Sequence, residues 1–104
     1  MSNRVETLPK LAGETVPRTV DFISKLPSGV TIASADCLAS VYTGNDPSPG
    51  GLVSAATTIS GTQLTQVIAG GVAGTIYELQ WIAVGSDGNT YQMASYLAVT
   101  PDLP

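Results

Sequence analysis

The sequence predicts an all-β protein built as a two-sheet sandwich of about six or seven strands. From residue 19 onward the chain is rich in Val, Ile, Thr, Ala and Gly, a composition typical of strands and turns. Turn signals recur about every 8 to 12 residues, and no segment shows a sustained helical periodicity. The 104 residues suffice for one hydrophobic core. We therefore expect a single sandwich at residues 19–104, preceded by an extended N-terminal arm at residues 1–18.

The arm is expected at residues 1–18 because this segment contains Pro9 and Pro17 and lacks sustained apolar periodicity. It also differs from the rest of the chain in charge. The four cations of the chain are Arg4, Lys10, Arg18 and Lys25. From residue 26 onward the sequence holds five acids and no cation.

We expect the arm to contact another protein chain through side chains that combine positive charge with apolar surface. These residues are Arg4, Val5, Leu8, Lys10, Leu11, Val16 and Arg18. The cations would steer the contact toward an acidic neighbour, including the body of an identical copy, while the apolar side chains would contribute most of the affinity. The alternative is a solvated terminus, which is common at the ends of domains.

The first half of the sandwich is expected to hold short strands separated by a Pro/Gly turn. The predicted segments are a strand around 20–24, a turn at 26–29, an extended piece at 30–35 and a strand at 36–43. In the last of these, Cys37, Ala39 and Val41 share one face. Cys37 has no partner for a disulfide, and we interpret it as a small buried hydrophobe rather than a reactive thiol.

The middle of the chain is punctuated by prolines and glycines. The predicted segments are an irregular turn at 44–51, a strand at 52–59, a tight turn at 60–61 and a strand at 62–69 that ends at Gly70-Gly71. The alanines of this region could be mistaken for a helix, and a short helix within 55–69 is the competing outcome. The Thr, Ile, Val and Gly content favours strands.

Two long strands are expected to close the chain, at residues 75–84 and 90–100. The first places four side chains on one face: Tyr77, Leu79, Trp81 and Ala83. The sequence GSDGN between the strands is typical of a hairpin turn. In the second strand Tyr96 is out of phase with the apolar residues, which implies either a bulge or a half-exposed face.

Tyr77 follows a glycine-rich corner at the start of the penultimate strand. This placement is typical of a tyrosine corner, whose hydroxyl bonds back to upstream backbone, and it favours the immunoglobulin-like form of the sandwich. Trp81, on the same predicted face, is expected to be a core anchor.

The sequence offers no recognisable chemistry for catalysis or for holding a metal. It has no histidine and a single cysteine, and it contains neither a nucleophile elbow nor a phosphate-binding loop. The acidic loops around Asp46 and Asp87 could attract calcium, but each has a single Asp, so we interpret them as turns. We therefore predict no enzyme activity, no catalytic residue, no cofactor and no metal.

Composition also argues against two classes of partner. The isoelectric point near 4.2 argues against nucleic acid, whose phosphates require a basic surface. No run of about 20 apolar residues is present, so we expect no membrane partner. The first ten residues lack the apolar stretch of a secretory signal.

Several motifs between residues 20 and 100 resemble those of a known family. They are Asp21-Phe22, residues 26–35, Ile59-Ser60-Gly61, the glycine-rich block 70–77, Ser86-Asp87-Gly88 and residues 96–99. With these motifs the chain resembles the small immunoglobulin-like virion proteins of tailed bacteriophages, the fibre-tail adaptor and decoration-type proteins. The most distinctive part is the Gly-Gly-x-x-Gly-x-x-Tyr block.

The resemblance implies a non-enzymatic structural protein that is made in the host cytoplasm and becomes part of the virion. Its expected partners are other virion proteins of the capsid, portal, tail or fibre, and we expect it to act as a homo-oligomer in the assembly. The alternative is a recognition module of an adhesin-like protein, binding carbohydrate or a cell surface. Against this alternative, the chain begins at Met1 without a signal.

Overall fold

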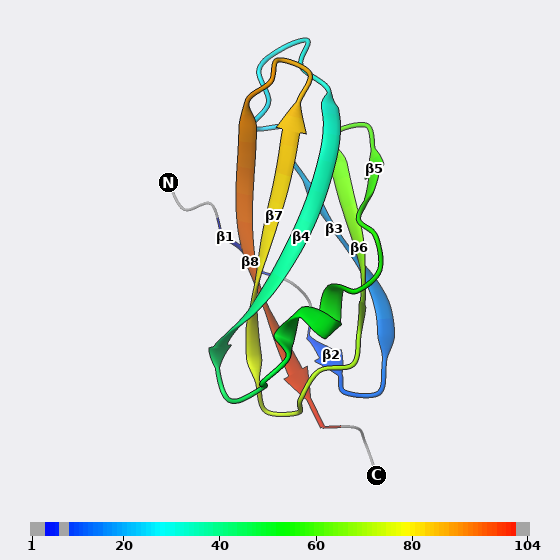
Figure 1. Ribbon diagram of the computed structural model, residues 1–104, viewed down its shortest axis with the longest axis vertical. Helices are drawn as coiled ribbons and strands as arrows, with labels where there is room; N and C mark the ends of the chain where they lie inside the picture. The colour runs from blue at the N-terminus through cyan, green and yellow to red at the C-terminus, as the bar shows by residue number, and fades with distance from the viewer. Residues whose placement is uncertain (1–3, 7–8, 102–104) are drawn as a thin grey trace.

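The computed structural model describes residues 4–6 and 9–101, with only the backbone described at 4–6 (Figure 1). These residues form strands and one short 3-10 helix, and no α-helix is found among them. The strands are β1 (Arg4–Glu6), β2 (Lys10–Leu11), β3 (Thr15–Asp21), β4 (Ile32–Thr43), β5 (Thr58–Ser60), β6 (Gln63–Ala69), β7 (Ile76–Gly85) and β8 (Thr90–Thr100), and the 3-10 helix is η1 (Pro49–Val53). The predicted all-β class is confirmed.

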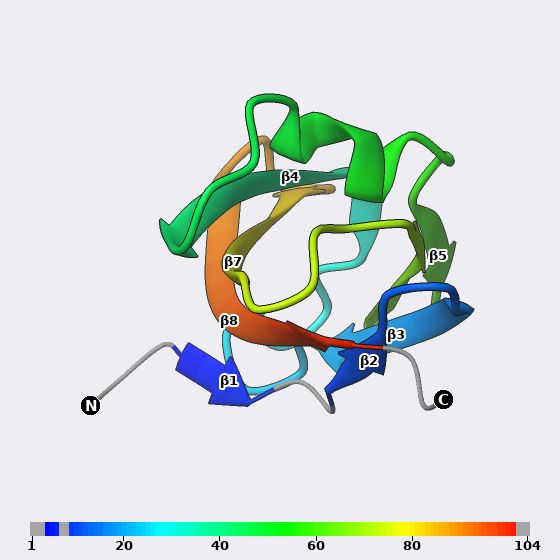
Figure 2. The same cartoon turned by 90° about the horizontal axis from the view of Figure 1, so that it is seen from below.

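The strands form two sheets that face each other across one core (Figures 1 and 2). The larger sheet has the order β1-β8-β7-β4, with β2 also paired to β8, and the smaller sheet has the order β3-β6-β5. The orders β3-β6-β5 and β8-β7-β4 correspond to strands B-E-D and G-F-C of an immunoglobulin domain, which supports the immunoglobulin-like prediction. Both β1 and β2 run parallel to β8 and line its outer edge.

The core is built on the alternation of β7. Its four inward side chains, Tyr77, Leu79, Trp81 and Ala83, are all 0% exposed, which confirms the predicted face. The indole Nε1 of Trp81 donates a hydrogen bond of 2.9 Å to the Ser95 hydroxyl on β8, so the buried ring leaves no polar atom unpaired. Cys37 lies opposite Trp81 in the β4–β7 register and is buried, as predicted.

Three predicted boundaries in the first two-thirds of the chain differ from the structure. The first strand begins at Thr15 rather than near Val20, because residues 15–21 pair along their whole length with β6. The expected division between arm and sandwich therefore falls inside β3. The two pieces expected at 30–35 and 36–43 form one strand, β4, with a register shift between Ile32 and Ser34.

The strand predicted at 52–59 is the third difference. Residues Pro49–Val53 form η1, with a proline in its first turn, and only Thr58–Ser60 pair as a strand. Leu52 is buried in the core and anchors this segment. The loop after η1 is held by the buried Gln66, whose amide nitrogen donates to the Ala55 carbonyl at 2.7 Å and whose oxygen accepts from Thr57 at 2.6 Å.

Tyr96 resolves the phase question of the last strand. The β7–β8 pairing runs without a register shift from Ile76 to Val84, so no bulge is needed. Tyr96 points to the outer face of the larger sheet and is partly exposed, while its neighbour Leu97 is 0% exposed in the core. Of the two outcomes left open, the half-exposed face is the one observed.

Candidate interaction surface

The residues expected to contact another chain are largely integrated into the sandwich. Arg4 and Val5 lie in β1, where their backbone pairs with Ala94 and Ser95 of β8, and Leu8 lies outside the described residues. Leu11 and Val16 are half-buried in β2 and β3.

Lys10 is completely buried, although it was expected to be a cation of an exposed arm. Its ammonium donates to three backbone carbonyl oxygens, those of Leu11 at 2.7 Å, Ala12 at 3.2 Å and Gly70 at 2.6 Å. Because Gly70 follows β6 in the smaller sheet and β2 lies on the larger one, this side chain ties the two sheets together. A buried charge requires such compensation. The side chain is therefore used within the chain.

Arg18 also binds locally. Its guanidinium donates to the carbonyls of Pro17 at 3.0 Å and Pro9 at 3.2 Å, so it holds the start of β2 against β3. The predicted cations at 10 and 18 thus help to fasten the N-terminal segment to its own domain. No signal in the sequence predicts these bonds, because each depends on a carbonyl group that the fold brings next to the side chain, that of Gly70 for Lys10 and that of Pro9 for Arg18.

A different surface gathers exposed apolar and aromatic side chains. The outer face of β8, β7 and β4, here called the tyrosine face, carries Leu38, Tyr42, Ile76, Ile82, Ala94 and Tyr96. Leu38 is 48% exposed and Tyr42 is 54% exposed. The rings of Tyr42 and Tyr96 are stacked, with centroids 4.5 Å apart and an angle of 29° between their planes. The stacking orders two aromatic rings on the same outer face, one from each of the two strands that flank β7.

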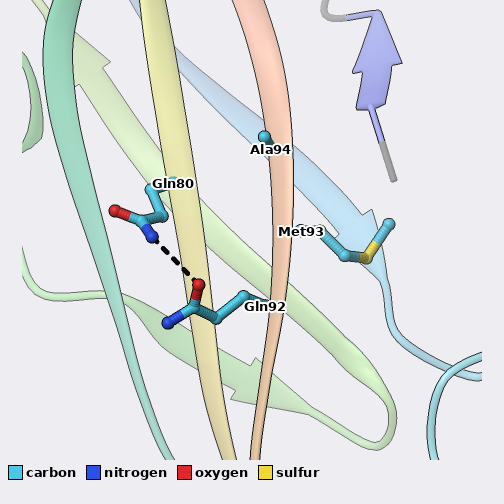
Figure 3. Close-up of a pocket in the computed structure, with 4 residues that line it drawn as sticks. All are labelled: Gln80, Gln92, Met93 and Ala94. Carbon is cyan, nitrogen blue, oxygen red and sulfur yellow. Dashed lines mark hydrogen bonds between the residues drawn. The ribbon is translucent and has the colours of Figure 1, made fainter. Parts of the chain in front are cut away.

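The tyrosine face also has an open hollow of about 150 Å³, lined by Gln80, Gln92, Met93 and Ala94 (Figure 3). The side-chain amide of Gln80 on β7 donates to the amide oxygen of Gln92 on β8 at 3.0 Å, and both point outward from the sheet (Figure 3). Ala94 has too short a side chain to fill the space next to them. The hollow therefore combines a small apolar floor with amide groups that can also bond to a partner.

The charge of the tyrosine face has one sign. The register places Asp36 and Glu78 on it, and the sequence has no cation after Lys25. The outward residues of β3 and β6 on the smaller sheet are different, since they include a cross-strand pair of hydroxyl groups bonded to each other. Thr19 and Thr65 hydroxyls lie 2.8 Å apart. The two outer faces of the sandwich thus differ in chemistry.

The predicted tyrosine corner is present and also involves an acidic loop. The Tyr77 hydroxyl accepts a hydrogen bond of 2.8 Å from the Val72 amide and donates one of 2.6 Å to Asp46. This donation, followed by that of the Ser48 amide, lowers the pKa of Asp46. The hydroxyl therefore links the β4–η1 loop to the β6–β7 corner.

The second acidic loop has a similar internal role. The Asp87 carboxylate accepts hydrogen bonds from the Tyr91 hydroxyl at 2.7 Å and from the Asn89 backbone amide at 3.1 Å. Both bonds lower the pKa of Asp87, and the bond from Tyr91 has the larger effect. Both loops considered for calcium use their carboxylates to hold turns. Within the described part of the chain no three His, Cys, Asp or Glu side chains gather in a way that could hold a metal ion. The described residues also form no helix that is long and apolar enough to cross a membrane.

A sandwich with two loop carboxylates engaged in turns, and an aromatic outer face on three strands that contain no Lys or Arg, has the features of a small binding module. The comparisons specify which kind. The family described as "Gp77: Podophage GP4 fiber-tail adaptor protein gp77" matches residues 10–98, so the chain belongs to this family of phage fibre-tail adaptors. The predicted kinship with phage adaptor proteins is confirmed, and the chain is a structural component of a phage virion. No match is found among curated proteins.

Proposed function

We propose that the chain is a non-catalytic connector that binds other virion proteins at the junction between tail and fibre, and that the tyrosine face makes the principal contact. The family supports the adaptor role. The observation that supports this choice of surface is the stacking of the exposed Tyr42 on the partly exposed Tyr96, with Leu38 exposed on the same face. Interface centres are enriched in aromatic residues and depleted of charge.

The N-terminal segment extends the same surface. Its strand β1 pairs with β8 at residues 94–96, directly beside Ala94 and Tyr96 of the tyrosine face. We propose that Arg4 and Val5 add contacts to a neighbouring virion protein at this edge, and that Leu8, outside the described residues, also contacts that protein. The other predicted contact residues act mainly by fastening the segment, as the bonds of Lys10 and Arg18 indicate.

We further propose that several copies act together in the particle. An adaptor between a symmetric tail and its fibres works by repetition, and head-to-tail contacts that close form rings. The acidic body of one copy is complementary in charge to Arg4 in the N-terminal segment of the next.

Virion incorporation tests the proposed surface. A phage carrying Leu38→Ser together with Tyr42→Ser is expected to incorporate far less of the protein, measured by mass spectrometry of purified particles. Val67→Ser is the matched control, because Val67 is an exposed aliphatic side chain (39%) on the opposite sheet. Both purified variants should keep the β-rich circular dichroism spectrum of the parent. Normal incorporation of the double variant would show that the tyrosine face is not the contact.

A further inference from the structure

The two edges of the larger sheet differ in whether another strand pairs with them. At one edge β1 and β2 pair with β8 and cover it. At the other edge stands β4, which pairs only with β7 among the described residues (Figure 1). An uncovered edge strand presents backbone amides and carbonyls that can pair with another chain. The free edge of β4 is thus a second surface, separate from the outward face of the same sheet.

One hydrogen bond shows which backbone groups face this edge. The amide of Cys37 is bonded to the Asp36 carboxylate at 2.8 Å, so it does not bond to β7. In an antiparallel ladder alternate residues turn their backbone groups to the same side. The amides and carbonyls of Ala35 and Ala39 therefore also face the free edge, although the side chain of Cys37 points into the core.

Two elements lie close to β4, the helix η1 and the short strand β5 (Figures 1 and 2). Neither is joined to β4 by a backbone hydrogen bond in the described residues. The pairing of β4 with β7 is regular from Ser34 to Val41, with register shifts only at its two ends. This stretch is long enough to receive a strand of several residues.

Between the register shifts at its two ends, β4 has little in its sequence that prevents strand addition. The sequence of β4, IASADCLASVYT, contains no lysine and no proline, and Asp36 is its single charged residue. Asp36 is exposed, and its carboxylate occupies the edge-facing amide of Cys37. An incoming strand can pair at this position only if it gives the carboxylate another partner. A Lys or Arg on that strand would do so.

We infer that the free edge of β4 is a strand-addition site for an extended, basic segment of another virion protein, and that Asp36 selects for a cation on that segment. The inference rests on the proposed adaptor role and adds a mode of attachment, in which backbone hydrogen bonds supply affinity and the charge at residue 36 supplies selectivity. The β4 strand of a second copy fits poorly. It brings another Asp36 and no cation.

Peptide binding to the purified full-length protein tests this assignment. The probe is a peptide of about ten residues that alternates Thr and Val and carries one central Lys, the composition of an edge-pairing strand, and its twin carries Glu instead. The Lys peptide is expected to protect the amides of Ala35, Cys37 and Ala39 from hydrogen exchange, measured by NMR. It should bind about two- to fivefold more tightly than the Glu peptide, the range that an exposed ion pair allows.

Two variants test the charge of Asp36 separately from the backbone pairing at the edge of β4. Asp36→Asn keeps an acceptor for the Cys37 amide and removes the charge, so it should bind both peptides equally. Asp21→Asn is the matched control, the same change at an exposed acid of the smaller sheet that also accepts a backbone amide, and it should keep the preference for Lys. Equal binding of the two peptides to the parent protein, or an absence of protection at the three amides, would overturn the inference.

The remaining outcomes identify other occupants or a failure of the adaptor role itself. If raising the concentration of the protein alone protects the same amides, the occupant is a second copy and the inference is wrong. Phage carrying Asp36→Asn should incorporate less protein than phage carrying Asp21→Asn. Normal incorporation of Asp36→Asn alongside loss with Leu38→Ser and Tyr42→Ser would refute the β4 site and leave the proposed function standing.

Discussion

Replacing Tyr77 by Phe tests the link between the tyrosine corner and the β4–η1 loop. The ring is 0% exposed and its hydroxyl bridges the Val72 amide and the Asp46 carboxylate. Phe keeps the packing but leaves the Val72 amide without this acceptor, which costs about 1–3 kcal/mol of unfolding free energy. For a domain of about 100 residues each kcal/mol lowers Tm by roughly 4–8 °C. Urea and thermal unfolding at pH 7 measure the loss.

The pH dependence of this loss provides a second check. The Tyr77 hydroxyl lowers the pKa of Asp46 in the folded chain, so its stabilising effect is present above the unfolded pKa of that carboxyl and disappears as the pH falls through the folded pKa. The stability difference between parent and Tyr77→Phe should therefore shrink in acid.

Tyr91→Phe is the matched control for this substitution. The Tyr91 hydroxyl also donates to a carboxylate, that of Asp87, but in an exposed hairpin. Its loss should cost less than about 1 kcal/mol, the range of an exposed hydrogen bond. If Tyr77→Phe costs no more than Tyr91→Phe, or if its cost does not fall in acid, the bridge does not stabilise the fold as argued.

Three further predictions concern buried side chains. Trp81→Ala should lower the unfolding free energy by about 3–5 kcal/mol, as for other large buried aromatics, and a variant as stable as the parent in urea would contradict the core role. Lys10→Met should lower the unfolding free energy by about 1.5–3 kcal/mol, because three carbonyls lose a charged donor. Lys25→Met, in the β3–β4 loop, is the control and should change the unfolding free energy little. Burial, and then the charge of Asp36, raise the pKa of the Cys37 thiol to about 12, so iodoacetamide at pH 8 should modify it only after unfolding in urea.

The proposed N-terminal contact requires a deletion that spares the sandwich. Removing residues 2–18 would take away β2 and half of β3, so any loss of assembly could reflect unfolding. Removing residues 2–8 leaves both strands intact, and the truncated protein should keep its β-rich spectrum but incorporate less well into particles. Full incorporation of this truncated protein would show that residues 2–8 make no necessary contact.

The last two strands could be predicted from the sequence because their side chains alternate strictly between core and surface. In β7 four inward residues are large or apolar, and the hairpin that follows has the glycine its turn requires, with Gly88 at a φ of 83°. The tyrosine corner was recognisable for the same reason, since Tyr77 follows a glycine-rich corner. These signals are local and do not depend on distant partners.

The strands near the N-terminus were harder to predict. In β3 the half-buried positions include Val16 and Arg18, so the alternation is weakly apolar, and pairing with β6 decides where the strand begins. Residues 52–57 have strand composition but lie in η1 and a loop, because Leu52 fills the core and Gln66 bonds the loop.

Only part of the candidate surface could be predicted from the sequence. The alternation in β8 left open a half-exposed face at Tyr96, but the stacking of Tyr96 with Tyr42 depends on the distance between two strands that β7 separates. The free edge of β4 has no sequence signature of its own, because an edge exists only once the strand order is known.

The sequence by itself determined the all-β class, the inward residues of the last two strands, the tyrosine corner and the kinship with phage adaptor proteins. Each of these depends on alternation, turn chemistry or motifs within short stretches of chain. The tertiary structure decided that Lys10 is buried and bonded to backbone carbonyls, where β3 begins, and which edge of the larger sheet is covered. These features depend on hydrogen bonds and packing between residues far apart in the chain, such as the 2.6 Å bond from Lys10 to the Gly70 carbonyl, which no local pattern encodes.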